Sequence, residues 1–334
     1  MPVVRVSLSG PLSSELLLRH FPGRVPRWGE FSFDLAGAEA NPDYWVVLHD
    51  LQRPERCRCA PSRTVLLFWE PSAICRCGDR FTSQFGAVVT CQASLRHPRV
   101  LLHQPGLPWW AGIRMESGAE WRAVADYDFF KAAVLPEKAD RISVINSGKR
   151  MVAGHEARGR FVAALKERFG DRVELFGRDS RPVADKLDAI APFKYHLAIE
   201  NSVEPHYWSE KLADAFLGDA MPIYCGCPNV SEYFPADSIC RIDVRDHAAA
   251  LRSIEAALAS DAFSRTAALR AAAREQLMDQ HNLFAFLARV LPTLPPAAPR
   301  AVTLRPRGDL ERPIHGRIKR RVRRTLEGLS RRGA

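Results

Sequence analysis

The chain lacks a long apolar run, although 46% of its 334 residues are hydrophobic. No stretch approaches the roughly 18 consecutive apolar residues that would indicate a membrane-spanning helix. The first residues, MPVVRVSLSG, also lack the basic segment and apolar core of a secretory signal peptide. The sequence therefore predicts a cytoplasmic protein, and its length favours two domains over one.

The eight cysteines lack the spacing of a metal site. Cys57/Cys59 and Cys75/Cys77 form two Cys-x-Cys pairs, whereas the paired ligands of structural zinc are usually separated by two to four residues. We therefore expect reduced thiols, which are normal inside a cell, and no metal ion.

Net positive charge is nearly absent outside the C-terminal tail. The net charge is +10, but residues 300–334 hold 12 Lys and Arg against three acids, which leaves about +1 for the other 299 residues. Because no other segment adds a basic patch with interleaved aromatic residues, nucleic acid is not an expected partner.

The tail itself carries an apolar stripe on a basic background. A helix over residues 314–329 would align Ile314, Ile318, Val322, Leu326 and Leu329 on one side. The pattern predicts an amphipathic helix that binds an anionic membrane surface, joined to the globular part by the Pro-rich segment 292–300. A solvated or disordered basic tail is the alternative.

Short apolar runs recur at intervals that leave room for helices or loops, which predicts an α/β protein with parallel sheets. The expected strands are 3–7, 45–49, 64–69, 87–90 and 99–102, followed by 141–145, 173–176, 195–199, 222–224 and 238–242. A Pro- and Gly-containing break at 106–118 separates the two series. We therefore predict one domain over 1–125, a second over 126–291 and a linker with tail over 292–334, with the binding site between the two domains.

Polar residues gather after the expected strand 195–199. The triplet Glu-Asn-Ser at 200–202 follows its carboxyl end, where ligands lie in open parallel sheets. Ser209 is a suitable N-cap for the next helix, whose first turn holds Glu210 and Lys211. The helix dipole disfavours a lysine there by roughly 0.3 to 1 kcal/mol unless an anion lies nearby. The pattern favours a phosphate beside Lys211 and a ribose-like group beside Glu210, with a solvated Glu-Lys pair as the alternative.

A second cation supports the anion hypothesis. The segment EARGRFVAALKERFG predicts a helix on which Arg158 shares the core-facing side with Phe161, Val162 and Leu165. A buried guanidinium needs a partner, so we expect Arg158 to point into the cleft and bind a phosphate. An ion pair with a neighbouring carboxylate is the alternative. The turn SVINSGKR, 143–150, lacks the glycine-rich phosphate-binding patterns.

Four segments together resemble a known family. The sequence YHLAIENSVEPHYWSEKLADAFLGDAMPIYCG is similar to the donor-binding signature of glycosyltransferase family 10, the α-1,3/1,4-fucosyltransferases. YFPADSICRID, ARGRFVAAL and FGRD resemble three further elements of that family. The resemblance covers residues 142–244, and the chain departs from the pattern at Ile199, His206 and Ser209.

The resemblance implies a GT-B-like fold, in which two Rossmann-like domains face each other across a cleft. It also implies that Lys211 and Arg158 neutralise the β-phosphate of the donor, which replaces a metal cofactor. Asp126-Tyr127-Asp128 has the D-x-D pattern of metal-dependent transferases, but so short a pattern arises readily by chance. The residues expected to contact a GDP-sugar are Arg158, Glu200, Asn201, Tyr207, Glu210 and Lys211.

The family places a glutamate before a similar Ser-Pro context, and LLFWEPSAI puts Glu70 at the carboxyl end of an expected strand. We therefore predict that Glu70 is the general base, with a pKa raised by desolvation beside Trp69. An exposed loop acid is the alternative reading of Glu70, and His103 and His97 are weaker candidates for the base.

The expected function is inverting transfer of L-fucose from GDP-fucose to a saccharide hydroxyl, such as that of a lipopolysaccharide glycan. The tail would hold the enzyme on the inner face of the membrane. A non-catalytic nucleotide- or saccharide-binding module and a transferase for another nucleotide sugar are the alternatives.

Overall fold

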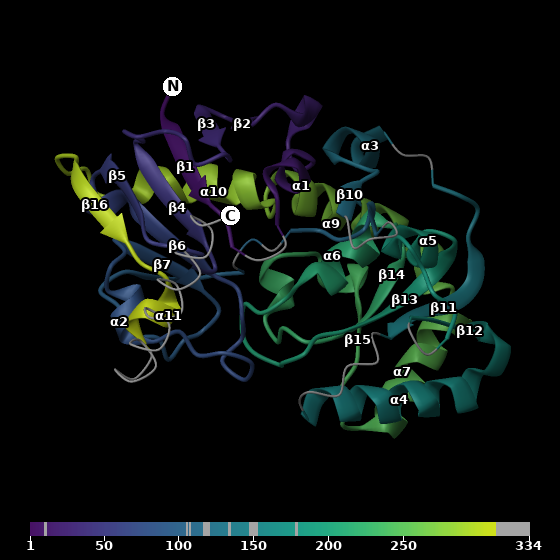
Figure 1. Cartoon of the computed structure of the whole chain (residues 1–334). Helices are drawn as coiled ribbons and strands as arrows, with labels where there is room; N and C mark the ends of the chain where they lie inside the picture. Colours follow the sequence, from purple (N-terminus) through teal and green to yellow (C-terminus); the bar gives the residue numbers. More distant parts are fainter. Residues whose placement is uncertain are drawn as a thin grey trace, which may run out of the picture.

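A computed structural model describes residues 1–9, 12–104, 106, 108–115, 121–132, 135–146, 153–177 and 180–311. Two α/β domains lie side by side, each built on its own largely parallel sheet (Figure 1). This architecture confirms the predicted fold class. Among the described residues, no helix is long and apolar enough to cross a bilayer.

The first domain contains a seven-stranded sheet in the order β2-β3-β1-β4-β6-β7-β8. Neighbouring strands are parallel except for the β2–β3 pair. The central strands β4 and β6 are buried along their whole length, as expected where both sheet faces are covered. The strands are β1 (Val3–Ser7), β2 (Arg27–Trp28), β3 (Phe31–Asp34), β4 (Tyr44–Leu48), β6 (Thr64–Phe68), β7 (Ala87–Thr90) and β8 (Val100–Leu102).

Helices cover one face of this sheet, and a helix with a two-stranded ribbon covers the other. The first face packs against α1 (Ser14–Leu18) and α10 (Leu283–Val290). The opposite face packs against α2 (Asp79–Thr82) and the antiparallel pair of β5 (Glu55–Cys59) and β16 (Arg300–Leu304).

The second domain contains a parallel five-stranded sheet in the order β12-β11-β13-β14-β15. Helices α6 and α9 pack on one face, and α4 and α7 on the other. The strands are β11 (Ala139–Asn146), β12 (Val173–Gly177), β13 (Phe193–Ile199), β14 (Met221–Cys225) and β15 (Cys240–Arg241). The helices are α4 (Ala153–Phe169), α5 (Lys186–Ile190), α6 (Glu210–Leu217), α7 (His247–Ala259), α8 (Ala262–Arg265) and α9 (Ala267–Asp279).

All ten strands expected from the sequence are present, with ends that differ by at most two residues. The sequence did not predict β2, β3, β5 or β16, nor the hairpin of β9 (Ile113–Met115) and β10 (Trp121–Ala123). These strands are short, and several are polar or exposed, so they carry no continuous apolar run.

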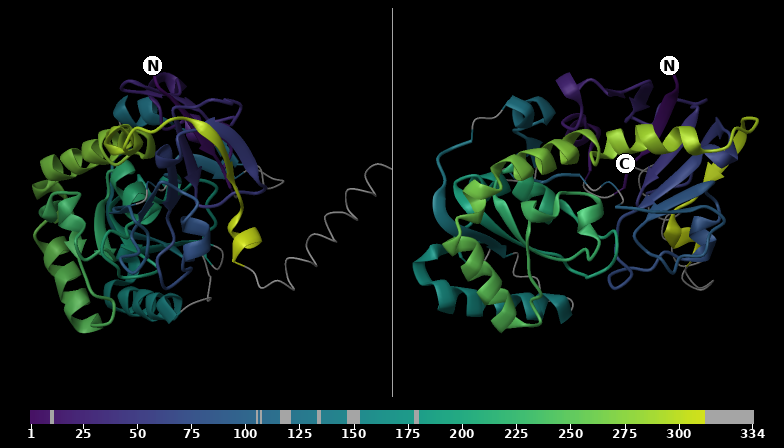
Figure 2. Two further views of the ribbon diagram at one scale, coloured as in Figure 1. Left: turned by 90° about the vertical axis from the view of Figure 1, so that its left-hand side faces the viewer. Right: turned by 180° about the vertical axis from the view of Figure 1, so that it is seen from behind.

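The chain crosses between the domains twice, which corrects the predicted boundaries. The outward crossing is the segment that leads from the first domain to the second. The buried guanidinium of Arg19, in the first domain, donates hydrogen bonds to the carbonyl groups of Trp109, Ala111 and Ala125 in this segment. On the return, α9 packs on the second domain and α10 on the first, and the two helices run across the back of the molecule (Figure 2). Residues 283–291 therefore belong to the first domain, although the sequence assigned them to the second.

The Pro-rich segment leads into a strand that packs on the first domain and not directly into the predicted tail, which is a second correction. Strand β16 pairs with β5, and the Leu304 side chain is fully buried in the core. The short helix α11 (Arg307–Leu310) follows, and the backbone N–H of Arg307 donates to Asp50 Oδ1 at 2.9 Å. Residues 300–311 thus form a strap on the first domain. The amphipathic helix expected at 314–329 lies outside the described residues.

Candidate active site

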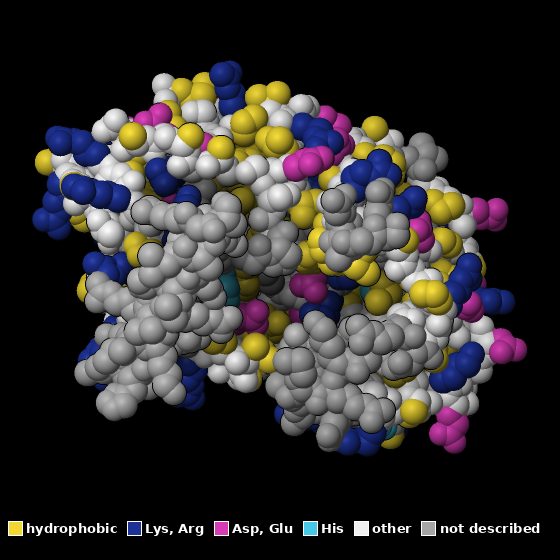
Figure 3. Space-filling model, in the orientation of Figure 1, with side chains coloured by type: hydrophobic (Ala, Val, Ile, Leu, Met, Phe, Trp, Pro, Cys, Tyr) yellow, Lys and Arg dark blue, Asp and Glu magenta, His cyan; other side chains and the backbone are white. Residues whose placement is uncertain are grey.

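A pocket of about 630 Å³ lies where the two domains meet. Figure 3 shows this hollow between the two halves of the molecule, with acidic and basic side chains inside it. Five of the seven predicted site residues line the pocket, and they come from both domains. They are Glu70 after β6, Arg158 on α4, Asn201 after β13, and Glu210 and Lys211 at the start of α6.

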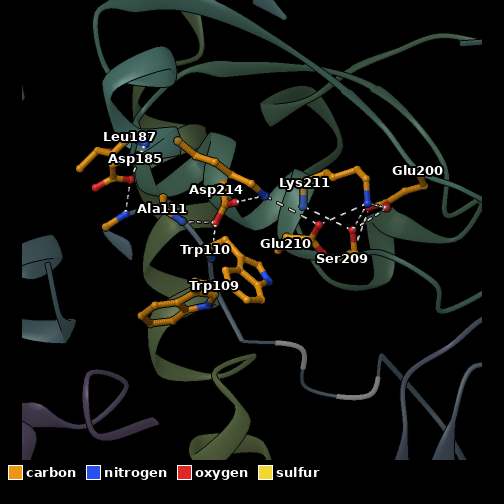
Figure 4. A network of polar contacts seen from close by, with 12 residues as sticks. Trp109, Trp110, Ala111, Asp185, Leu187, Glu200, Ser209, Glu210, Lys211 and Asp214 are labelled. Carbon is orange, nitrogen blue, oxygen red and sulfur yellow. Dashed lines mark hydrogen bonds and ion pairs between the residues drawn. The ribbon is translucent and has the colours of Figure 1, made fainter. Parts of the chain in front are cut away.

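The N-terminus of α6 is held by a buried carboxylate. Ser209 caps the helix as predicted, because its Oγ accepts from the Lys211 backbone N–H. The backbone N–H and the Oγ of Ser209 donate to the two oxygens of Glu200, at 2.7 and 2.6 Å (Figure 4). Glu200 therefore fixes the turn that leads into the helix. Gly226 leaves room for it, because an added Cβ would clash with Cγ of Glu200.

The Lys211 ammonium lies between two carboxylates. Its Nζ is 3.3 Å from Glu210 Oε1 and 3.6 Å from Glu200 Oε2. Burial alone would lower the pKa of Lys211, but these carboxylates raise it above its ordinary value. Burial alone would raise the pKa of Glu210, but the ammonium groups of Lys211 and Lys186 lower it to about 2. Both groups are therefore charged at neutral pH.

Two further charged residues line the pocket, Lys186 and Asp214, and the sequence analysis missed both. Lys186 Nζ lies 3.0 Å from Asp214 Oδ2, and Asp214 Oδ1 accepts from the backbone N–H groups of Trp110 and Ala111, both at 2.9 Å (Figure 4). The Asp214 side chain thus ties α6 to the outward crossing and also holds a cation at the pocket. The sequence did contain a signal for Asp214, because this acid falls on the buried face of an amphipathic helix.

Glu70 enters the pocket from the first domain. Its backbone carbonyl accepts a hydrogen bond from Gln92 Nε2 at 2.9 Å, which fixes the start of the loop. Burial raises the pKa of the Glu70 carboxyl, the Glu210 carboxylate raises it further, and Lys211 opposes this shift. The placement and the direction of the shift agree with the base hypothesis, whereas the role itself stays a prediction.

The two alternative bases lie elsewhere. His103 does not line the pocket, and its ring stacks on Phe286 with centroids 4.4 Å apart. Burial lowers the pKa of His103 to about 4. His97 is occupied at the other end of the sheet, where its ring nitrogens contact the carbonyl oxygens of Arg99 and Phe85.

Two of the residues predicted to contact the ligand do not line the pocket. Glu200 is 5% exposed and Tyr207 is 3% exposed, and neither side chain lines the pocket. Glu200 instead positions Ser209 and Lys211. The motif therefore contains residues that build the site as well as residues that face it.

The described residues contain no group of three or more His, Cys, Asp and Glu side chains that could hold a metal ion. In the D-x-D sequence, Asp126 Oδ1 accepts from the Phe129 backbone N–H at 3.0 Å, and Asp128 Oδ2 from the Gly23 backbone N–H at 2.7 Å. These contacts stabilise a helix start and a turn outside the pocket. Both acids of the D-x-D sequence therefore have structural roles.

Comparison with known proteins locates the same region. Residues 136–262 match the model of the glycosyltransferase family 10 (fucosyltransferase) C-terminal domain. The chain is 29% identical over 94 residues to a human 4-galactosyl-N-acetylglucosaminide 3-alpha-L-fucosyltransferase. The aligned residues make up 27% of this chain and 26% of that protein. It is 35% identical over 104 residues to mouse alpha-(1,3)-fucosyltransferase 4, and the aligned residues make up 29% of this chain and 24% of that protein.

A solved structure of an alpha1,3-fucosyltransferase with GDP-fucose is similar over 80% of this chain and 81% of that chain, with 15% identity and a TM-score of 0.46. The chain spans about a quarter of the length of the curated relatives it matches. The matched segment contains α4, α5, the loop after β13 and α6, which supply every pocket residue named above from the second domain. Residues 136–262 of this chain are therefore similar to the C-terminal domain of glycosyltransferase family 10.

Proposed function

We propose that the protein is a glycosyltransferase that moves L-fucose from GDP-fucose onto a saccharide hydroxyl with inversion. The observation that carries this proposal is a single pocket that holds Glu70 of the first domain together with Arg158 and Lys211 of the second. The names of the fucosyltransferase relatives support the choice of donor.

The second domain would bind the donor. Lys211 stands in the first turn of α6, where the helix dipole favours a phosphate. Arg158 lines the same pocket and offers a planar guanidinium to a second phosphate oxygen. Glu210 stays ionised between two lysines and can accept hydrogen bonds from ribose hydroxyls.

The first domain would supply the base. Glu70 removes the proton from the acceptor hydroxyl as its oxygen attacks the anomeric carbon, and the bond from that carbon to the diphosphate oxygen breaks. GDP then leaves with the negative charge, which Lys211 and Arg158 stabilise. Because two protein cations do this, the proposal includes no metal cofactor. The raised pKa of Glu70 brings its basicity closer to that useful at neutral pH.

A nucleotide screen tests the donor proposal. GDP and GDP-fucose should raise the Tm of the protein, whereas UDP, CDP and their sugars at equal concentration should not, because a ligand that binds only the folded state stabilises it by RT ln(1 + [L]/Kd). The readout is thermal unfolding followed by fluorescence. Stabilisation by a uridine or cytidine nucleotide alone would contradict the choice of GDP.

The proposed location is the inner membrane surface, with a glycan acceptor such as that of lipopolysaccharide. Residues 312–334 hold nine Lys and Arg against one Glu, and each basic residue near an anionic surface contributes about 1 kcal/mol. This charge and the apolar spacing of the tail support the proposal.

Two truncations test the roles of tail and strap separately. A variant ending at Glu311 should keep the wild-type Tm but lose binding to phosphatidylglycerol vesicles in a sedimentation assay. A variant ending at Pro299 should also lose several degrees of Tm, because it removes the partner of β5 and the buried Leu304. Undiminished vesicle binding by the Glu311 variant would overturn the membrane proposal, and an unchanged Tm of the Pro299 variant would contradict the role of the strap.

A further inference from the structure

A hydrogen-bonded bridge joins the loops that carry the two halves of the pocket. Ser72, two residues after Glu70, donates to Glu204, three residues after Asn201. The Ser72 backbone N–H lies 3.3 Å from Glu204 Oε2, and Ser72 Oγ lies 2.9 Å from Glu204 Oε1. Ser202 Oγ also donates to Glu204 Oε1, at 3.1 Å. One carboxylate thus contacts a loop of each domain. In the first domain this is the base loop, residues 70–75, and in the second it is the donor loop, residues 200–209.

The base loop is anchored to its own domain at both ends. Gln92, which is 3% exposed, donates through Nε2 to the carbonyl oxygens of Glu70 at 2.9 Å and Cys75 at 2.7 Å. Ser72 lies between these anchors and is half-buried. The loop therefore has a fixed start and end, and its middle is held by the opposite domain.

The donor loop is anchored in the same way. The Glu200 backbone N–H donates to the Cys225 carbonyl at 2.8 Å, and the Glu200 side chain holds Ser209 at the start of α6. Glu204 lies between these two fixed points and is half-buried. Each side of the bridge is thus rigidly connected to residues that line the pocket.

We propose that Glu204 is a positioning residue that sets the placement of the Glu70 loop relative to the donor loop. This inference rests on the proposed function, since it assigns Glu70 and the donor groups to one reaction. Hydrogen bonds to an ionised carboxylate are roughly twice as strong as neutral ones, so the bridge is suited to holding this geometry. A displacement of about 1 Å in a reacting group can lower a rate 10²-fold.

Other contacts keep the domains together without the bridge. The Gln104 backbone N–H donates to the Tyr233 hydroxyl at 3.1 Å, and Gln104 Nε2 donates to the Trp208 carbonyl at 3.4 Å. Asn282, between α9 and α10, donates to the His20 carbonyl at 2.7 Å. Loss of the bridge should therefore alter the local geometry of the pocket and leave the fold intact.

The test compares Glu204→Ala, Ser72→Ala and their double variant with Glu167→Gln, an exposed change on α4. Glu204→Ala should lower kcat roughly 10-fold to 100-fold, while the KM for GDP-fucose and the Tm shift caused by GDP stay within twofold of wild type. Ser72→Ala should lower kcat less, and the double variant should lower it no further than Glu204→Ala, because both changes remove the same bridge. Glu204→Gln keeps one acceptor oxygen and should recover part of kcat. Glu167→Gln should match wild type.

Hydrogen exchange gives a readout that does not depend on transfer. In Glu204→Ala, the amide of Ser72 should exchange faster than in wild type, while exchange in β6 and α6 stays unchanged. Unchanged exchange at Ser72, or a wild-type kcat in Glu204→Ala, would overturn the proposal that Glu204 positions the Glu70 loop. If exchange changes as expected but the wild-type protein transfers no sugar, the proposed function fails and the bridge remains only as a structural contact.

Discussion

Replacement of Glu70 by Gln should lower sugar transfer roughly 10²-fold to 10⁴-fold, the usual contribution of a positioned general base. Gln is close to Glu in size but cannot accept the proton of the acceptor hydroxyl. GDP affinity should stay nearly unchanged, because the proposed donor contacts come from the second domain. Steady-state release of GDP from GDP-fucose with a saccharide acceptor measures the first quantity, and titration calorimetry with GDP measures the second.

The pH profile adds a second readout for Glu70. A base acts only when it is ionised, so transfer should fall as the pH drops through the pKa of Glu70. Burial raises that pKa, so the acidic limb of kcat/KM should lie above the ordinary range of a glutamate. Glu30→Gln, an exposed change in the same domain, should leave rate and profile unaltered. A Glu70→Gln variant with wild-type turnover would mean that another group accepts the proton.

Replacement of Lys211 or Arg158 by Ala should weaken GDP binding roughly 10-fold to 150-fold, because each change removes a charge-assisted phosphate contact of about 1.5 to 3 kcal/mol. Transfer should fall at least as far, since the same contacts would stabilise the leaving group. Arg252→Ala, an exposed change on α7, serves as the control. Wild-type GDP affinity in both variants would contradict the proposed phosphate site.

The Lys211 variant should also be less stable than the Arg158 variant. Removal of Lys211 leaves the buried Glu200 carboxylate without the cation that lies 3.6 Å away. GDP affinity should therefore be measured at a temperature where the unliganded variant is folded, as shown by its own thermal transition. Arg158→Ala then tests the phosphate site without this complication.

Much of the fold could be predicted from local sequence. Strands such as β4 and β6 are buried on both faces and appear as short apolar runs, so their positions were found within two residues. The domain boundaries could not be predicted in this way. Helix α10 packs on the first sheet, but its sequence LFAFLARV would suit the core of either domain. The bonds from Arg19 to residues about 100 positions away leave no local pattern.

The site was predicted in part because its residues follow two strands or begin a helix. Glu70, Asn201 and Lys211 stand at such positions, and the structure brings them to one pocket. The sequence could not separate residues that face the pocket from residues that support it, so Glu200 was expected to touch the ligand. Lys186 was missed because its link to Asp214 joins two helices through a side-chain contact.

Turnover of GDP-fucose is the most direct test of the central claim. This claim is that one pocket combines the donor-binding residues of the second domain with a general base from the first. The wild-type protein should release GDP from GDP-fucose when a suitable saccharide hydroxyl is present, and release should fall at least 10²-fold in Glu70→Gln while GDP still binds. GDP binding by the wild-type protein without release from GDP-fucose or any other GDP-sugar, across a broad panel of saccharide acceptors, would contradict the account and favour a non-catalytic nucleotide-binding module.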